Sequence, residues 1–522
     1  MDLRTRTGAS SRSAAIEAAR SAFRTGDVGT AERICAQIVA ANPGDYDAWS
    51  LLTETALQRG RHDAAIVCAD RALASAPDDP IALALRAKCL FLSGDPRAAL
   101  QTAEAAAQRV GDAAEALDAV GAMFGLLGRH HRAMILFARA VGLRPDVPQY
   151  LFNLAAAERM VGALDDAERH CNAAIARDRG YALAHYLRSD LRIQTSERNH
   201  VAEMEALLGE RRLAPSSEIL LRFALGKECE DLDQHDRAFA HIQAGCDLQR
   251  VSANTDPASG LAEIEHIIRT HTREWIAQAP PGYAGAAPVF VTGLPRTGTT
   301  LVERIISSHP AMSSVGETGA FAAELKRAMS AGVRPDPAEL GRRYWETAAA
   351  LDQGGGTRVV DKTLENYLYC GLIHAALPDA KIILVQRHPL DVGWAMYKAH
   401  FQGKFQFSYD QLQLADYVLA FRRLSQHWRA TLPADRLLEV HYEDIINDHA
   451  AVSRRLIDFV GLTWDDEVLQ FHQSKAPSAT ASAVQVRRPI YASSIGKWRH
   501  HADRLAPLRE RLARELPPSE LP

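Results

Sequence analysis

The sequence predicts a multidomain α + α/β protein, in which an N-terminal α-solenoid precedes a P-loop-like α/β domain with a mostly parallel sheet. Three observations support this prediction. One glycine recurs every 34 residues between positions 26 and 162. After residue 288, short apolar runs typical of buried strands alternate with helical segments, which favours a parallel sheet covered on both faces. The first of these runs leads directly into a glycine-containing loop of the kind that binds anions.

The composition limits the class of protein. At 522 residues the chain is too long for one ordinary domain, and its formal net charge of −4 gives no reason to expect nucleic acid or an anionic membrane as the main partner. Met1 to Arg20 lacks the apolar core of a secretory signal, and no apolar stretch is long enough to cross a bilayer. Seven cysteines occur singly without a CxxC pair, which is typical of reduced thiols. We therefore expect a cytoplasmic protein with no membrane span and no nucleic-acid partner.

The N-terminal 180 residues carry a repeat with aligned columns of small residues. The first column is Gly26, Gly60, Gly94, Gly128 and Gly162. Five residues later the second column is Ala31, Ala65, Ala99, Ala133 and Ala167. Glycine lets the chain turn between two short helices, and alanine lets those helices approach closely. Proline, as at Pro43, Pro77 and Pro145, ends the second helix. In period and small-residue positions this array resembles the tetratricopeptide repeat.

A helical bundle with accidental periodicity is the alternative to a repeat array. A stacked array exposes a concave groove, so a peptide or protein is the partner expected there, although the repeats could instead brace the second half. Beyond residue 180 the register weakens, residues 261–275 have a helical pattern, and residues 279–285 have the composition of a linker. The expected domains are a repeat array at 1–180, degenerate helical repeats with a cap and linker at 181–285, and an α/β domain at 286–522.

The segment from Pro288 to Thr300, PVFVTGLPRTGTT, predicts a strand, a loop and the start of a helix. Loop amides and the helix dipole favour an anion at such a junction. The spacing Gly293-x4-Gly298 is that of a nucleotide-triphosphate loop, but Thr299 stands where that loop has lysine. This argues against ATP or GTP hydrolysis and ranks a nucleoside kinase low. An ordinary strand-to-helix turn is the structural alternative.

Further strands are expected at 358–360, 381–385 and 436–440. Ligands of parallel sheets bind beyond the carboxyl ends of the strands. The polar residues at those ends are Thr292–Thr300, Asp361–Thr363, Gln386–Arg387 and His441–Glu443. The C-terminal half also carries an ordered series of motifs: Leu294–Thr300, Gly316–Thr318, Asp361–Thr363, Arg387–Asp391, Tyr442–Glu443 and Ser482-x2-Gln485-Val486-x2-Pro489-x7-Lys497-Trp498. This series resembles a sulfotransferase that uses 3′-phosphoadenosine 5′-phosphosulfate, and within that superfamily it is most similar to the tyrosylprotein sulfotransferase type.

The resemblance implies which residues bind the nucleotide. The residues that hold the 5′-phosphosulfate would be Arg296, Thr297, Gly298, Thr299 and Thr300. Arg387 would bind the 3′-phosphate, where a guanidinium can bond two oxygens at once. Tyr442, Ser482 and Lys497 would complete the pocket. The family usually has serine eight residues after this arginine, and here that position is Ala395, so one donor is missing unless Lys398 or Tyr397 compensates.

The resemblance also implies the catalytic residues. Glu317 would be the general base, Lys362 would contact the bridging oxygen and the sulfonate, and Arg296 could share that duty. No metal is expected. Glu317 could instead cap a helix or pair with an arginine, and Lys362 could form a surface ion pair with Asp361.

Other residues leave further alternatives open. A histidine among His388, His400 and His441 could replace Glu317 as the base. The aromatic residues Trp394, Tyr397, Phe401, Phe405 and Phe407 are expected mainly in the core, although some could wall an acceptor pocket.

The expected function is sulfonate transfer to a hydroxyl acceptor, with a protein or peptide tyrosine as one candidate and a small molecule or glycan as another. A repeat scaffold for protein interaction, with a catalytically weak nucleotide-binding domain, is the alternative that Ala395 favours.

Overall fold

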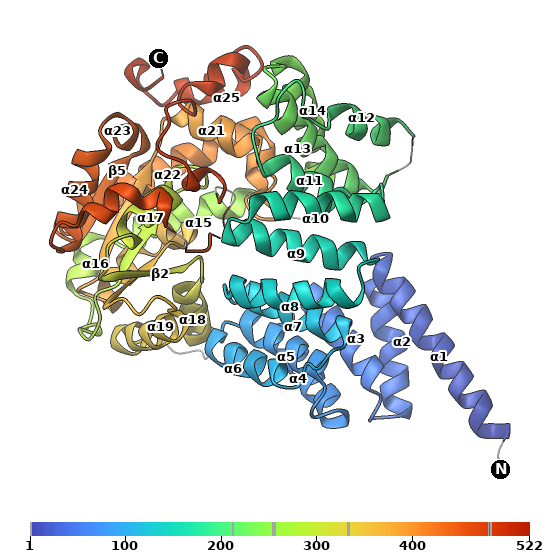
Figure 1. Cartoon of the computed structure of the whole chain (residues 1–522). Helices are drawn as coiled ribbons and strands as arrows, with labels where there is room; N and C mark the ends of the chain where they lie inside the picture. Colours follow the sequence, from blue (N-terminus) through green and yellow to red (C-terminus); the bar gives the residue numbers. More distant parts are fainter. Residues whose placement is uncertain are drawn as a thin grey trace. The chain divides into compact units, whose positions relative to one another are not determined.

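The computed structural model describes residues 3–210, 213–252, 257–330, 335–474, 476–478, 480 and 483–521. Over these residues the chain is mostly helical, with one five-stranded parallel sheet in its C-terminal part (Figure 1). The predicted fold class, a helical repeat array followed by an α/β domain, is confirmed. The chain divides into two compact units, Met1–Asp146 and Val147–Pro522. The expected domain boundaries near residues 180 and 285 stay a prediction.

The first unit consists of paired helices joined by the glycine column. Its helices are α1 (Leu3–Arg24), α2 (Val28–Ala41), α3 (Tyr46–Gln58), α4 (His62–Ser75), α5 (Pro80–Leu92), α6 (Pro96–Ala107), α7 (Ala114–Leu126) and α8 (His130–Leu143). The turn glycines Gly26, Gly60, Gly94 and Gly128 have φ between 68° and 87°, which residues with a Cβ rarely adopt. The alanines five residues later are fully buried between helices. Both columns therefore have the structural roles that the sequence predicts.

The second unit begins with further helices of the same kind. They are α9 (Pro148–Val161), α10 (Leu164–Arg177), α11 (Ala182–Asp190), α12 (Val201–Glu210), α13 (Pro215–Asp231), α14 (His235–Ser252), α15 (Pro257–Thr270) and α16 (Arg273–Ala277). Gly162 continues the glycine column with φ of 92°. The single helix expected over 261–275 is wrong, because the chain breaks at His271 and Thr272 caps a new helix by accepting from the Trp275 amide.

The sheet contains five parallel strands in the order β2-β3-β1-β4-β5. They are β1 (Val289–Thr292), β2 (Met312–Gly316), β3 (Arg358–Asp361), β4 (Lys381–Gln386) and β5 (Leu437–His441). The strands expected around 289, 358, 381 and 436 are confirmed. Sequence reasoning missed β2, since MSSVG is short, largely polar and at an edge of the sheet.

Both faces of the sheet are buried, as a parallel sheet requires. Phe290, Ile382 and Leu384 point into one core, whereas Val289, Val291 and Ile383 point into the other. The covering helices are α17 (Thr299–Ser307), α18 (Ala320–Ser330), α19 (Pro337–Leu351), α20 (Cys370–Ala376), α21 (Pro389–Tyr397), α22 (Gln411–Thr431), α23 (Tyr442–Asn447), α24 (His449–Val460) and α25 (Ala506–Ala513). Short 3₁₀ turns are η1 (Leu364–Leu368), η2 (Gln406–Tyr409), η3 (Asp466–Gln473), η4 (Gln485–Arg487), η5 (Lys497–His501) and η6 (Pro518–Glu520).

The core on the Phe290 face extends into the helices that precede the sheet. Phe223 of α13, Phe239 of α14 and Ile264 of α15 belong to the same buried cluster as the strands. Trp394 of α21 stacks on Phe239, with ring centroids 5.9 Å apart. The expectation that Trp394 and Tyr397 lie in the core is confirmed, and Phe401, Phe405 and Phe407 pack against that core. The helices before the sheet and the α/β region therefore share one core.

Two chain-wide features complete the description. The seven cysteines are free thiols, and all but Cys68 are buried. Among the helices that the structure describes, none combines the length and the apolar character needed to span a membrane.

The contact between α13 and α14 depends on a glycine within a helix. A Cβ on Gly226 would lie 2.5 Å from Cγ1 of Ile242, far inside the normal contact distance. Both Ile242 and the neighbouring Ala224 are buried. The two helices can pack at this distance only because position 226 has no side chain.

Gly226→Ala is expected to lower the free energy of unfolding by about 1–2 kcal/mol, because overpacking a core costs about 1–3 kcal/mol and alanine regains only part of this through helix propensity. Gly209→Ala is the control, since it also lies in a helix but has nothing within 4 Å of the added Cβ. The control should be slightly stabilising. Urea denaturation checks both variants, and equal stability of the two would contradict the packing argument.

A buried ion pair joins α13 to α21. Glu230 of α13 accepts hydrogen bonds from Lys398 Nζ at 2.5 and 2.7 Å and from Trp394 Nε1 at 3.2 Å. The side chains of Glu230 and Lys398 are only 10% and 22% exposed. Burial alone would raise the pKa of Glu230, but the charges of Lys398 and Lys497 outweigh it and lower the pKa to about 2. The carboxylate is therefore part of the folded structure at neutral pH.

Glu230→Ala is expected to cost about 3 kcal/mol of stability, because it leaves Lys398 buried without its partner. Since the folded pKa is about 2 and the ordinary value 4.5, the unfolded state binds this proton more tightly. The stabilisation is complete above the ordinary pKa and is lost as pH falls towards 2.

Urea denaturation between pH 7 and pH 3 checks this. The difference in unfolding free energy between the wild type and Glu230→Ala should become smaller as the pH falls. Glu265→Ala, which breaks the exposed pair with Arg423, is the control and should change stability little at any pH. A difference between wild type and Glu230→Ala that does not depend on pH would contradict the assignment.

Candidate active site

The loop between β1 and α17 is held by close backbone packing. A Cβ on Gly293 would lie 2.5 Å from the Val385 carbonyl oxygen, so the loop touches β4 directly. Gly298 has φ of 99°, and a Cβ there would meet the Tyr442 ring at 2.5 Å. Arg296 has φ of 68°, an uncommon conformation for a residue with a side chain. The loop is therefore a fixed turn shaped by its two glycines and by the neighbouring strands.

The start of α17 presents hydrogen-bond donors. Among the described residues, no backbone carbonyl accepts from the amides of Gly298, Thr299 or Thr300, as expected for the first turn of a helix. The Thr297 hydroxyl instead donates to the Leu294 carbonyl at 2.7 Å. Thr297 therefore braces the loop, while the three amides that follow can donate to an anion.

The register of β2 and β3 brings Glu317 and Lys362 together. Gly316 pairs with Asp361 across the two parallel strands, and the Lys362 amide donates to the Gly316 carbonyl at 3.0 Å. Glu317 and Lys362, the residues that follow these two strands, therefore leave the sheet side by side. Lys362 Nζ donates to a carboxylate oxygen of Glu317. The lysine side chain is 1% exposed and that of the glutamate is 39% exposed. A buried cation thus meets an accessible carboxylate, and Lys362 does not form the surface pair with Asp361.

Asp361 is a buried carboxylate that fixes this strand end. Its oxygens accept from the Thr363 amide at 2.9 Å, the Tyr344 hydroxyl at 3.2 Å and Asn366 Nδ2 at 3.3 Å. Burial raises the pKa of Asp361, although the hydrogen bonds from Thr363 and Tyr344 partly offset the effect. Asp361 therefore orients the chain on which Lys362 lies.

Arg387 follows β4 and lies against the loop. Its guanidinium donates to the Arg296 carbonyl at 3.0 Å and to the Ser494 carbonyl at 2.6 Å, and lies over the Tyr442 ring at 4.7 Å. Its Nε is buried without a partner in the described part of the chain. Tyr442 is held in turn by a hydrogen bond between its hydroxyl and Ser494 Oγ at 2.7 Å. The structure therefore places Arg387 and Tyr442 beside the loop.

The remaining predicted nucleotide ligands are only partly defined. Lys497 begins η5, near enough to Glu230 to lower the pKa of that carboxylate. Ser482 lies outside the described residues. Ala395 is buried in α21, and Lys398, one candidate to replace its missing donor, is bound by Glu230. Tyr397 is buried in the core with its carbonyl accepting from Cys246.

Each histidine proposed as an alternative base has a different environment. His388 stacks on Trp498, and burial lowers its pKa. His400 packs against Tyr186 and Phe223, and burial lowers its pKa to about 4. His441 is exposed at the end of β5. Glu317 is the group that contacts Lys362.

Sequence reasoning missed the residues that the preceding helices add to this site. Burial lowers the pKa of Arg296, while the nearby carboxylate of Asp190 and the Tyr186 hydroxyl, both on α11, act in the opposite direction. Glu230 of α13 is the third such residue. No local pattern in the sequence marks any of them, because their role depends on the packing of α11 and α13 against the α/β region.

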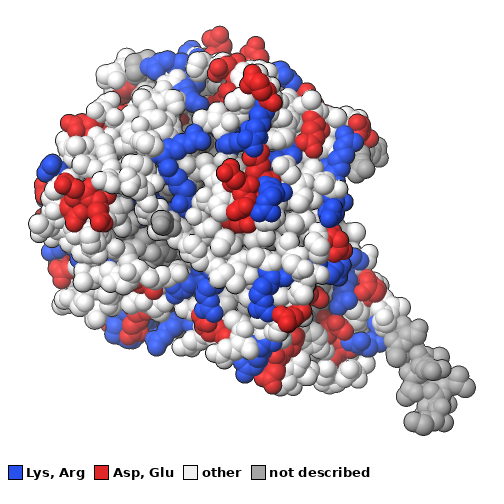
Figure 2. All heavy atoms as spheres, viewed as in Figure 1, with Lys and Arg blue, Asp and Glu red and all other residues white. Residues whose placement is uncertain are grey.

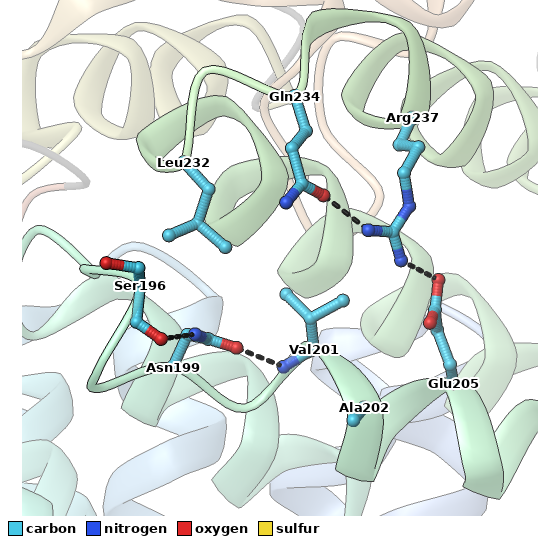
Figure 3. Close-up of a pocket in the computed structure, with 8 residues that line it drawn as sticks. All are labelled: Ser196, Asn199, Val201, Ala202, Glu205, Leu232, Gln234 and Arg237. Carbon is cyan, nitrogen blue, oxygen red and sulfur yellow. Dashed lines mark hydrogen bonds and ion pairs between the residues drawn. The ribbon is translucent and has the colours of Figure 1, made fainter.

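One cavity of the described structure lies away from the β1–α17 loop. A cavity of about 350 Å³ lies between α12 and the turn before α14, but its two charged residues, Arg237 and Glu205, pair with each other, and Arg237 also donates to Gln234 (Figure 3). On the face that Figure 2 shows, the described basic and acidic side chains are intermixed. Within the described residues no group of three His, Cys, Asp or Glu could hold a metal ion.

Comparison with known proteins gives two family matches. Residues 288–466 match the model described as "Sulfotransferase family", and residues 22–89 match that of the tetratricopeptide repeat. The first match covers β1 to β5 and with them the loop, Glu317, Lys362, Arg387 and Tyr442.

Several relatives share part of the chain. An uncharacterized protein of Aquifex aeolicus (strain VF5) is 29% identical over 329 residues, 59% of this chain and 43% of that protein. Protein-tyrosine sulfotransferase 1 of Danio rerio is 26% identical over 245 residues, 40% of this chain and 65% of that protein. Protein-tyrosine sulfotransferase A of Caenorhabditis elegans is 24% identical, over 42% of this chain and 62% of that protein. The chain thus spans less than two thirds of each of these relatives.

Among solved structures, the sulfotransferase domain of the Synechococcus PCC 7002 olefin synthase is 18% identical with a TM-score of 0.32, over 46% of this chain and 99% of that one. The Thermus thermophilus repeat protein TTC0263 is 19% identical with a TM-score of 0.30, over 38% of this chain and 99% of that one. Residues 22–89 are thus similar to tetratricopeptide repeats and residues 288–466 to the sulfotransferase family, and the first of these matches agrees with the repeat columns.

Proposed function

We propose that the protein is a cytoplasmic sulfotransferase that moves a sulfonate group from 3′-phosphoadenosine 5′-phosphosulfate to a hydroxyl acceptor, with a protein or peptide tyrosine as the favoured acceptor. The observation that carries the proposal is the contact between Lys362 and Glu317 beside the β1–α17 loop. A general base and a cation at one anion-binding site are the groups that transfer to a hydroxyl requires. The similarity to two protein-tyrosine sulfotransferases supports the choice of acceptor.

The residues around the loop suit a nucleotide that carries phosphate groups at the 3′ and 5′ positions of its ribose. The amides of Gly298, Thr299 and Thr300 can donate to a 5′-phosphate and its sulfonate. Arg387 keeps a buried Nε without a partner in the described residues, and an oxygen of a 3′-phosphate would satisfy it. Tyr442, Lys497 and, on family resemblance, Ser482 would border the same nucleotide.

Each catalytic group has one task. The nucleotide would supply the sulfonate, whose bond to the 5′-phosphate oxygen breaks as a bond to the acceptor oxygen forms. Glu317, which is accessible and lies beside Lys362, would take the proton of the acceptor hydroxyl. Lys362 and Arg296 would oppose the negative charge that develops on the phosphate oxygen. Charge is thus stabilised by groups that burial already holds in place.

The repeats fit this proposal in two ways. A repeat groove suits a peptide or protein, which a tyrosine acceptor would be. The later helices also border the catalytic residues, with Tyr186 and Asp190 close to Arg296. We therefore propose that the helices of Val147–Pro522 that precede the sheet brace the site as well as serve any partner of the repeats.

Lys362→Ala is expected to fold and bind the nucleotide but to lose nearly all transfer, by roughly a hundredfold or more, since it removes a cation that acts on the developing charge. The assay follows a sulfur-labelled donor with a cell extract as acceptor source, read by mass spectrometry. Lys381→Ala is the control, because that lysine lies at the opposite end of its strand and binds the Asp435 carbonyl. Transfer by Lys362→Ala at the wild-type rate would remove Lys362 from the mechanism.

Ala395→Ser is expected to tighten binding of the desulfonated nucleotide by roughly twofold to tenfold, the value of one added hydrogen bond. Isothermal titration calorimetry measures this directly. A wild-type chain that gave no binding heat, with none restored by Ala395→Ser, would favour the alternative of a repeat scaffold with an inactive domain. Unchanged affinity in an otherwise active protein would mean that another residue replaces the missing serine.

A further inference from the structure

The turn η4 contacts the β1–α17 loop on one side and a repeat helix on the other. Gln485, its first residue, accepts from Arg296 Nη2 at 3.2 Å. Arg487, its last residue, donates through Nη2 to the Met160 carbonyl at 2.9 Å, at the end of α9. Val486 between them is buried. A single 3₁₀ turn therefore connects the loop to the helix end at which Gly162 follows.

Arg487 depends on the absence of a side chain at Gly162. A Cβ on Gly162 would lie 2.6 Å from Cζ, 2.7 Å from Nη1 and 2.8 Å from Nε of the Arg487 guanidinium. Gly162 belongs to the glycine column of the repeats, but the other members described in this way, such as Gly128, have nothing within 4 Å of an added Cβ. The turn glycine of this one repeat thus has a second role, which is to accommodate Arg487.

Other contacts hold the chain that precedes this turn to the same helix end. The Ser478 amide donates to the Met160 carbonyl at 2.9 Å, and Arg159 donates to the Thr480 carbonyl at 3.5 Å. Arg159 is itself fixed by Asp190 of α11 at 2.5 Å. The end of α9 therefore offers both a carbonyl acceptor and a guanidinium donor to this part of the chain.

We infer that the end of α9 positions the nucleotide site: Met160 and Gly162 seat Arg487, and η4 thereby holds Gln485 against Arg296 of the loop. The inference rests on the proposed function for its ligand, the adenosine nucleotide with 3′- and 5′-phosphates. Met160, Gly162 and Arg487 are positioning residues that act through η4. The repeats thus contribute to nucleotide affinity from outside the pocket.

The test compares Gly162→Ala with Gly128→Ala, because both place a Cβ on a turn glycine of positive φ but only the first meets Arg487. Both variants should lose similar thermal stability. Gly162→Ala alone should weaken binding of adenosine 3′,5′-diphosphate, measured by calorimetry, by roughly threefold to tenfold, which corresponds to one or two hydrogen bonds. The KM for the donor should rise by the same factor while kcat changes little.

Arg487→Ala provides a second variant and a double-mutant test. Arg487→Ala should weaken nucleotide binding to a similar extent. Adding Gly162→Ala to Arg487→Ala should cause no further loss of affinity, because the guanidinium that the new Cβ would displace is already absent. Hydrogen exchange gives a readout that needs no nucleotide: the Arg488 amide, which donates to the Gln485 carbonyl at 3.2 Å, should exchange faster in Gly162→Ala than in Gly128→Ala.

The outcomes separate this inference from the proposed function. If the wild type binds the nucleotide and Gly162→Ala matches Gly128→Ala in affinity, the inference is overturned. An additive loss in the double variant would overturn it as well. If the wild type binds no nucleotide, the proposed function fails, and the exchange rates of Arg488 then decide the positioning role alone.

Discussion

The parallel register of β2 and β3 is the constraint on which the candidate chemistry depends. Because Gly316 pairs with Asp361, the residues that follow leave the two strands side by side, and Lys362 reaches Glu317. The lysine is almost fully buried, so this cation is favourable only next to a carboxylate. The buried carboxylate of Asp361, which accepts from Tyr344 and Thr363, fixes the same end of β3. A slip of one residue would separate the pair and leave Lys362 buried without a partner.

Packing extends this constraint to helices that precede the sheet. Phe223, Phe239 and Ile264 share a core with the strands, and Glu230 binds Lys398 across the same boundary. The region that begins at Val147 is thus one folded unit, in which helices of the repeat type support the sheet. The arrangement explains why Asp190 and Glu230, both far from the loop in sequence, influence charges at the candidate site.

The repeat array and the parallel sheet could be predicted because each has a local signature. The glycine and alanine columns, which recur every 34 residues, indicate turns between helices and close helix contacts. The loop motif indicates a strand followed by a helix. What could not be predicted depends on distant packing or on weak local signals. The edge strand β2 is short and polar, the break near His271 depends on the cap at Thr272, and the partner of Lys398 lies on α13. The nucleotide roles of the site residues, Ser482 included, stay predictions.

The departure of the loop from a nucleotide-triphosphate loop has a structural counterpart. In such loops a lysine at the start of the helix supplies the cation, whereas here Thr299 occupies that place and presents only a hydroxyl and an amide. Lys362 instead directly follows β3, which pairs with β1 and ends at Asp361. The cation thus comes from a strand end, paired with a carboxylate that can serve as a base, rather than from the loop. A loop lysine would strengthen binding of outer phosphates, whereas in the proposed function a lysine paired with Glu317 would couple positive charge to proton removal. Such coupling would suit transfer to a hydroxyl acceptor, whose proton must leave as the new bond forms.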